Sequence, residues 1–184
     1  MAVDPEEPAE IVRQTRHWLA KAVIGLNLCP FARPVHARDQ IRYAVSEAET
    51  PEALLADLIS ELQALAAAEP EEIETTLLIH PRVLNDFLDY NDFLGVAEET
   101  VAGLGLEGVL QAASFHPEYQ FAGTEPDDIT NYTNRSPYPT LHLLREASVE
   151  RAVAAVPDAA EIYERNMETL RRLGLKGWRR LGVG

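Results

Sequence analysis

The sequence has little cysteine, little positive charge and no long apolar run. Its 184 residues include one cysteine, Cys29, which excludes an intrachain disulfide and any metal site built on a CxxC pair. Lys and Arg together number 16 against 30 Asp and Glu, so the net charge is -14. Such an acidic surface repels phosphate backbones and anionic lipids, and we expect neither nucleic acid nor a membrane as a partner.

Other absences bear on location and size. No apolar run approaches the roughly eighteen residues that a membrane span needs. The first ten residues, MAVDPEEPAE, lack the basic and apolar blocks of a signal peptide, so we expect a soluble, cytoplasmic protein. The length suits a single domain, residues 1–184, around one core. The sequence makes no prediction about the oligomeric state.

Three segments carry strand patterns. Residues 41–46 alternate apolar and polar side chains, whereas residues 75–81 (TTLLIHP) and 109–115 (VLQAASF) are short apolar runs. Helical patterns separate them. We therefore expect an α/β fold with a small three-stranded parallel or mixed sheet (β-α-β-α-β) that helices cover.

The predicted helices have recognisable ends. Thr50 and Pro51 have the residue types of an N-cap and a first helical residue. Residues 82–103 are predicted to be helical, with a break near Tyr90. Additional N- and C-terminal helices are expected at residues 9–26 and from Asp158 to about position 174.

Two of the predicted strands end in the same dipeptide. His80-Pro81 follows one strand and His116-Pro117 follows another. If the strands are parallel, both histidines lie at one edge of the sheet, which is where open α/β sheets bind ligands. We expect the candidate site at this edge.

The most varied stretch of the chain is NYTNRSPYPTLHLLRE, residues 131–146. Ser136 and Pro137 resemble the start of a helix running to about Ala147, which would place His142 and Glu146 on one helix face. That pair could bind a divalent metal with His116 as the third ligand, or act as a general base with an orienting carboxylate. The alternative is a pair that only stabilises the helix.

Polar side chains around this stretch suggest anion binding. Arg135 and Arg145 have the chemistry to hold a phosphate or carboxylate. We also assign Asn131, Asn134 and Tyr119 to the substrate site. The alternative for both arginines is structural, namely pairing with a carboxylate of Asp127, Asp128 or Glu146 to pin the preceding loop.

Cys29 stands in the sequence LCPF, at a break between a predicted helix and Pro30. A thiol at such a position becomes nucleophilic if a neighbouring cation lowers its pKa, and a histidine could complete a Cys–His pair. The alternative is a buried structural cysteine, because free cysteine is among the most buried residue types.

Several blocks together resemble a known family. They are LNLCPFA, TTLLIHP, DFLDYNDFL, ASFHPEYQFAG and NYTNRSPYPTLHLLRE. In this order they are similar to a family of uncharacterised, mainly bacterial proteins, the domain of unknown function number 1415, from about His17 to Trp178. The resemblance implies no particular activity.

Together these residues favour an enzyme that acts on a small anionic molecule bearing a phosphate or carboxylate. His116, His142, Glu146 and Cys29 are the candidate catalytic residues, and a hydrolase or lyase using a metal or acid–base chemistry is the expected type. The alternative is a non-catalytic module that binds a ligand or a protein through exposed loop aromatics.

Overall fold

The computed structural model describes residues 8–156 and 158–184. The first seven residues of the acidic stretch MAVDPEEPAE, on which the expectation of no signal peptide was based, lie outside them. Within the described part of the chain, no helix is both long enough and apolar enough to cross a membrane.

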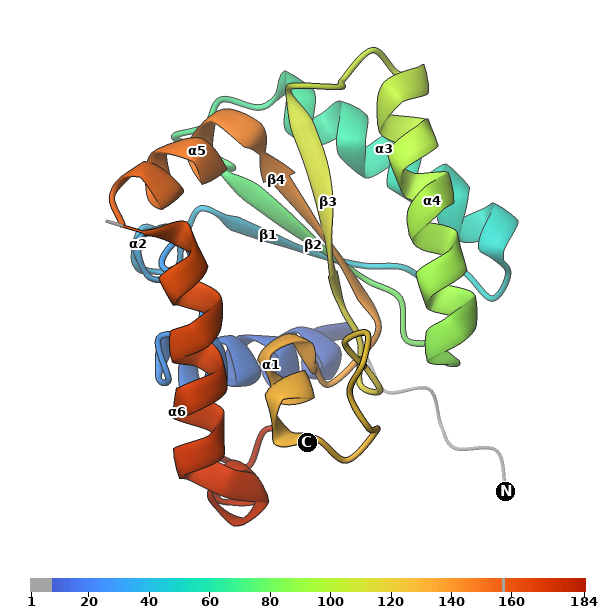
Figure 1. Cartoon of the computed structure of the whole chain (residues 1–184). Helices are drawn as coiled ribbons and strands as arrows, with labels where there is room; N and C mark the ends of the chain where they lie inside the picture. Colours follow the sequence, from blue (N-terminus) through green and yellow to red (C-terminus); the bar gives the residue numbers. More distant parts are fainter. Residues whose placement is uncertain (1–7, 157) are drawn as a thin grey trace.

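A mixed sheet of four strands forms the centre of the fold (Figure 1). Its order is β1 (Ile41–Val45), β2 (Thr75–Ile79), β4 (Thr140–Arg145) and β3 (Leu110–Phe115). β1 and β2 are parallel, whereas β4 runs antiparallel to both of its neighbours. The α/β class and the three predicted strands are confirmed, but the sheet has four strands rather than three.

The extra strand corrects the helix predicted from Ser136 to Ala147. Leu141 and Leu143 point to one face of β4 and His142 to the other, and both leucines are fully buried. An apolar run this short fits a strand or a helix, and partners distant in sequence decide between them. Here β2 supplies the partner on one side and β3 on the other, so β4 occupies a central position in the sheet.

Helices α3 (Pro51–Ala67) and α4 (Phe87–Gly103) cover one face of the sheet (Figure 1). Thr50 caps α3 and Pro51 is its first residue, as predicted. Asp86 caps α4 through the backbone N–H groups of the next turn, and α4 has no break at Tyr90. Leucines of α3 and aromatics of α4 pack on Leu141 and Leu143 to form the larger core cluster.

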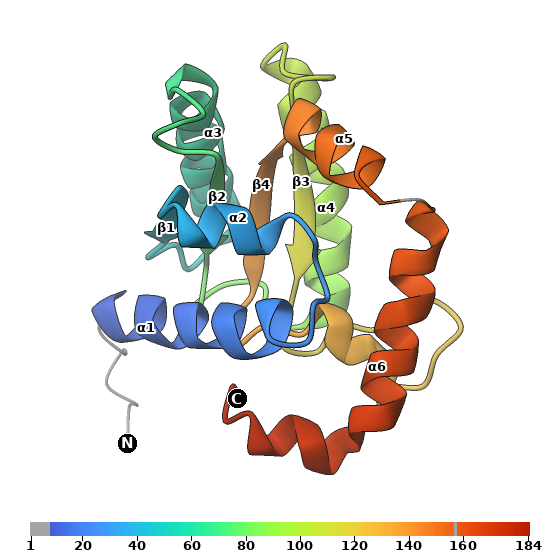
Figure 2. The same ribbon diagram turned by 90° about the vertical axis from the view of Figure 1, so that its left-hand side faces the viewer.

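The opposite face carries the remaining helices (Figure 2). They are α1 (Pro8–Trp18), its π-helical continuation η1 (Leu19–Ile24), α2 (Ala32–Ala37), α5 (Glu146–Ala154) and α6 (Ala159–Arg180). Asp158 caps α6 as predicted, and Gly174 interrupts that helix with a φ of 66°. Trp18, Leu170 and Trp178 form the centre of the apolar cluster on this side.

The long connection from β3 to β4 is ordered by its own polar groups and contains the short 3₁₀ helix η2 (Ile129–Asn134). The fully buried Asn131 accepts hydrogen bonds from the Phe121 backbone and the Thr124 hydroxyl. It also donates to the Glu125 carbonyl. The amide therefore closes the loop on itself, with its oxygen and one of its N–H groups bonded within the protein.

Tyr90 ties α4 to two strands at once. Its fully buried hydroxyl donates to the Thr140 carbonyl (2.7 Å) and accepts from the Phe115 backbone N–H (3.1 Å). These two groups lie at the start of β4 and the end of β3, which pair with each other. The single hydroxyl thus bonds to a backbone carbonyl and a backbone N–H of two strands at once.

We predict that Tyr90→Phe lowers the free energy of unfolding by about 2 kcal/mol, since the Thr140 carbonyl and the Phe115 N–H lose their hydrogen-bond partner. Urea denaturation followed by circular dichroism measures the change. Tyr163→Phe is the matched control, because that tyrosine is 48% exposed, and it should leave the midpoint unchanged. Equal midpoints for wild type and Tyr90→Phe would contradict this role.

Candidate functional site

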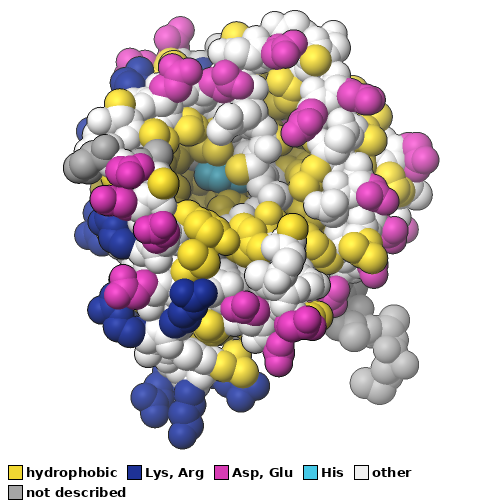
Figure 3. Space-filling model, in the orientation of Figure 1, with side chains coloured by type: hydrophobic (Ala, Val, Ile, Leu, Met, Phe, Trp, Pro, Cys, Tyr) yellow, Lys and Arg dark blue, Asp and Glu magenta, His cyan; other side chains and the backbone are white. Residues whose placement is uncertain are grey.

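A cavity of about 410 Å³ opens on the sheet face that carries α2, α5 and α6. Its lining is mostly apolar and comes from β3, β4, α5, α6 and the turn before α2. Figure 3 shows this side of the molecule as a hollow with a hydrophobic rim and histidine atoms at its floor. His142, Cys29 and Asn134 line the cavity, so it brings together three of the predicted site residues.

His142 reaches the cavity from the middle of β4, where its ring packs on Phe115 (centroids 5.7 Å apart). Its Nε2 lies 2.9 Å from the Thr75 hydroxyl oxygen. That hydroxyl donates its single proton to the Leu143 carbonyl (2.5 Å), so it can only accept from His142. Nε2 is therefore the protonated nitrogen, and Nδ1 keeps a lone pair that no described residue binds.

Burial sets the charge of this histidine. Removal from water lowers the pKa of His142 to about 4, so the imidazole is neutral at physiological pH. A neutral ring with a fixed tautomer and a free lone pair presents an acceptor to a proton donor on a bound molecule. Thr75 is the residue that fixes the tautomer.

Cys29 lies on the same cavity, in the turn between η1 and α2. Burial raises the pKa of its thiol, while the backbone N–H groups of Phe31 and Ala32 act in the opposite direction. Asn166 of α6 holds this turn, because its side chain donates to the Leu28 carbonyl (2.8 Å). The thiol is protonated at rest, beside two N–H groups that favour the thiolate once it forms.

Two amides add polar groups to the apolar lining. Asn134 donates to the Ser114 carbonyl (3.1 Å), and Asn166 donates to Leu28 as described. Each side-chain amide has two N–H groups. One N–H of each amide is therefore left to bind a ligand in the cavity.

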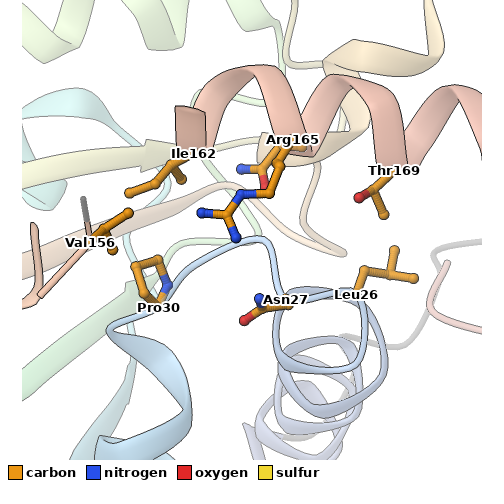
Figure 4. Close-up of a pocket in the computed structure, with 8 residues that line it drawn as sticks. Leu26, Asn27, Pro30, Val156, Ile162, Arg165 and Thr169 are labelled. Atoms are coloured by element: carbon orange, nitrogen blue, oxygen red, sulfur yellow. The ribbon is translucent and has the colours of Figure 1, made fainter. Parts of the chain in front are cut away.

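A smaller pocket of about 250 Å³ adjoins the cavity and shares Pro30, Ile162 and Asn166 with it. Figure 4 shows Arg165 extending from α6 over this pocket toward Pro30 and Val156. Arg165 is exposed and forms no hydrogen bond or ion pair with any residue in 8–156 or 158–184. Its guanidinium is therefore free to bind an anion in this pocket beside the cavity.

His80 and His116 do lie at one edge of the sheet, on either side of Tyr90, as their strand-end positions predicted. They lie on the α4 side, whereas His142 points to the other face. His116 donates from Nε2 to the Leu84 carbonyl and accepts at Nδ1 from the Glu118 N–H. His80 binds the Val83 carbonyl through Nδ1, so both rings hold the segment before α4.

The predicted metal set is not assembled. Glu146 begins α5 and lines a separate pocket beside Glu98 and Glu107 of the α4 side. His116 has no free nitrogen, and it lies across the sheet from His142. Among the described residues, no three His, Cys, Asp or Glu side chains are grouped closely enough to hold a metal ion.

Arg145 holds the end of α3 rather than an anion. Its guanidinium donates to the carbonyls of Leu65, Ala68 and Ile73 at 2.8–3.0 Å. These carbonyls lie at and just beyond the C-terminus of α3, where a cation is favoured. The structural alternative thus describes Arg145 correctly, although its partners are carbonyls and not the carboxylates named above.

Arg135 has a similar structural role. It donates to the carbonyls of Tyr119 (3.0 Å) and Pro126 (2.6 Å), and its guanidinium stacks on the ring of Tyr132. Tyr119 packs between Phe87 and Phe121. Neither Arg135 nor Tyr119 lines the cavity. The Asn131 amide is hydrogen-bonded within its own loop and does not line it either.

Comparison with known proteins gives one match. The profile of the family described as "Protein of unknown function (DUF1415)" matches residues 10–180. The chain belongs to this family. No curated protein and no solved structure matches it. The resemblance noted from the sequence blocks is thereby confirmed, and any function for this DUF1415 chain has to be argued from its site.

Sequence reasoning missed Thr75, Asn166 and Arg165. Arg165 and Asn166 lie on α6 with Ile162 and Thr169, at the spacing of one helix face. That spacing was visible in the sequence, but a helix face gives no sign of whether it meets solvent or a cavity. Thr75 appeared as one residue of a buried strand, and its role follows only from the pairing of β2 with β4.

We predict that Arg145→Met destabilises this DUF1415 protein by about 2 kcal/mol, because three partly buried carbonyls lose a charged donor. Thermal and urea unfolding measure the loss. Arg13→Met changes an exposed arginine of α1 and should have little effect. A stable Arg145→Met protein would show that the α3 carbonyls do not need this side chain.

The free energy of unfolding should also fall as the pH drops from about 6.5 to about 4. Burial lowers the pKa of both His80 and His142 to about 4, while unfolded histidines titrate near 6.5. Within this window the unfolded chain binds more protons, so acid favours unfolding. His142→Gln should flatten the dependence of unfolding free energy on pH, measured by urea titration at several pH values; an unchanged slope would contradict it.

Proposed function

We propose that this chain is a cytoplasmic enzyme that acts on a small anionic molecule with an apolar body. The apolar part would fill the cavity, and the anionic group would bind Arg165 at its mouth. His142 would accept or return a proton during the reaction. The proposal rests on one observation above all, the free Nδ1 lone pair of a neutral histidine whose tautomer Thr75 fixes.

The polarity of the cavity supports this substrate class. An apolar wall stabilises a hydrocarbon body, while an unpaired carboxylate or phosphate inside it would lose its hydration without compensation. The free guanidinium of Arg165 lies at the opening, where an anion keeps access to water. Ligand sites commonly combine an apolar lining with a few polar groups in this way.

The arrangement of the loop aromatics favours this enzyme over an interaction module. Tyr119, Phe121, Tyr132 and Tyr138 are all partly buried rather than gathered in an exposed patch. Phe121 lines the cavity and packs edge-on against Tyr163. Protein-binding surfaces instead expose their aromatic anchors together.

We predict that hexanoate raises the melting temperature more than hexanol does, since the two share a chain and differ in charge. Arg165→Met should weaken hexanoate binding by about tenfold, the loss expected for one charge-assisted contact, and leave hexanol unaffected. Arg172→Met, on the exposed surface of the same helix, is the matched control. Isothermal titration calorimetry measures the affinities.

The catalytic part of the proposal needs a second measurement. A pool of small carboxylates and phosphorylated metabolites is incubated with wild type and with His142→Gln, and consumption is followed by mass spectrometry. A metabolite that only the wild type consumes supports the acid–base role. If Arg165→Met binds hexanoate as tightly as the wild type does, the assignment of Arg165 to the anionic group is wrong. If turnover persists in His142→Gln, the acid–base role of His142 is wrong.

A further inference from the structure

Cys29 brings a thiol to the cavity, a nucleophile that the proposed acid–base role does not use. It lies in a turn that three hollows share, since Pro30 lines the main cavity, the Arg165 pocket and a third groove beside Arg38 and Arg151. The turn is also fixed from α6 by Asn166.

We propose that Cys29 is the nucleophile of an acyl-transfer reaction, with His142 as its general base, and that the substrate is a short-chain thioester or ester. This inference rests on the proposed function and names its substrate class. Two features of the cavity carry it. The cavity contains a thiol together with a histidine whose Nδ1 lone pair is free, and its apolar lining suits an acyl chain.

The step balances without any further reagent. His142 Nδ1 takes the thiol proton as Sγ attacks the acyl carbonyl carbon, so that a C–S bond forms. The bond from carbon to the leaving sulfur or oxygen then breaks, and the leaving group takes the proton from His142. Water, activated by the same nitrogen, hydrolyses the acyl-cysteine and restores the thiol.

Neighbouring groups suit each stage of this reaction. The backbone N–H groups of Phe31 and Ala32 interact with Sγ and favour the thiolate. The remaining N–H groups of Asn134 and Asn166 can donate to the carbonyl oxygen as it becomes negative. A thiol that is neutral at rest needs a base, and His142 is the histidine on this cavity.

The test uses the full chain and p-nitrophenyl butyrate, an ester whose leaving group is coloured. Cys29 is the only cysteine, so an acyl group on sulfur has one location. We expect a burst of about one equivalent of p-nitrophenolate and a mass increase of one butyryl group, both lost in Cys29→Ala. His142→Gln should slow the burst by about 100-fold, the usual contribution of a general base.

The variants separate a chemical role from a structural one. A glutamine at position 142 can still donate to Thr75 but has no Nδ1, whereas His36→Gln changes a histidine outside the cavity and should keep the wild-type rate. If His142→Gln fails to fold, His142→Ala leaves space for imidazole. Added imidazole should then restore the burst, an effect that a merely structural histidine cannot give.

Two outcomes would overturn the inference. One is a native chain that stays unacylated while its urea-unfolded form reacts normally; the other is acylation of His142→Gln at the wild-type rate. If Cys29→Ala still binds hexanoate and still turns over a metabolite through His142, only the nucleophile is wrong and the proposed function stands. If hexanoate binding is also absent from the wild type, both proposals fail.

Discussion

The insertion of β4 between β2 and β3 is the constraint on which the rest of the structure depends. Because β4 is central, both of its faces are covered, and alternate side chains are sent to different layers. Leu141 and Leu143 complete the core beneath α3 and α4. His142, between them in sequence, is directed to the opposite face and becomes the polar floor of a cavity. A shift of one residue in register would bury the histidine in the leucine core and remove the site.

The same strand explains why buried polar groups of one chemical type have different roles. The histidines at the strand ends meet backbone carbonyls and are used to hold loops, as the contacts of His80 and His116 show. His142, in the middle of a strand whose backbone groups are already paired, has only a side-chain hydroxyl beside it. One ring nitrogen therefore stays free. Position within the sheet, rather than residue type, separates a structural histidine from a candidate base.

The sequence predicted the elements whose signals are local. Thr50 and Asp158 were correctly identified as caps, and the three strands at residues 41–46, 75–81 and 109–115 were recognised from their patterns. The shared edge of His80 and His116 followed from parallel strands. The helix predicted over residues 136–147 was wrong because Ser136-Pro137 imitates a helix start, and because the leucines of β4 also fit one helix face. Only the ladder with β2, some sixty-five residues away in sequence, distinguishes the two.

The candidate site was predictable only in part, because its residue types are visible in the sequence but their grouping depends on pairings between distant segments. Cys29, His142 and Asn134 were named from the sequence and do line one cavity, but they were grouped with residues from the far side of the sheet. The arginines Arg135 and Arg145 were chosen for their polar neighbourhoods. In such neighbourhoods a guanidinium readily finds backbone carbonyl oxygens to donate to. Both arginines donate to carbonyls in this way. Arg165 had no such context, yet it makes no hydrogen bond or ion pair with the described residues and lines the pocket beside the cavity.

Charge also limits how a ligand can lie in the cavity. With a net charge of -14, the protein repels anions in general, so an anionic group needs a local cation to approach at all. Arg165 lies on the outer pocket, whereas the floor contains a neutral histidine and a neutral thiol. A carboxylate carried to that floor would lose its hydration without gaining a cation. The anionic end must therefore stay at the mouth, and it is the apolar end of the molecule that reaches Cys29 and His142.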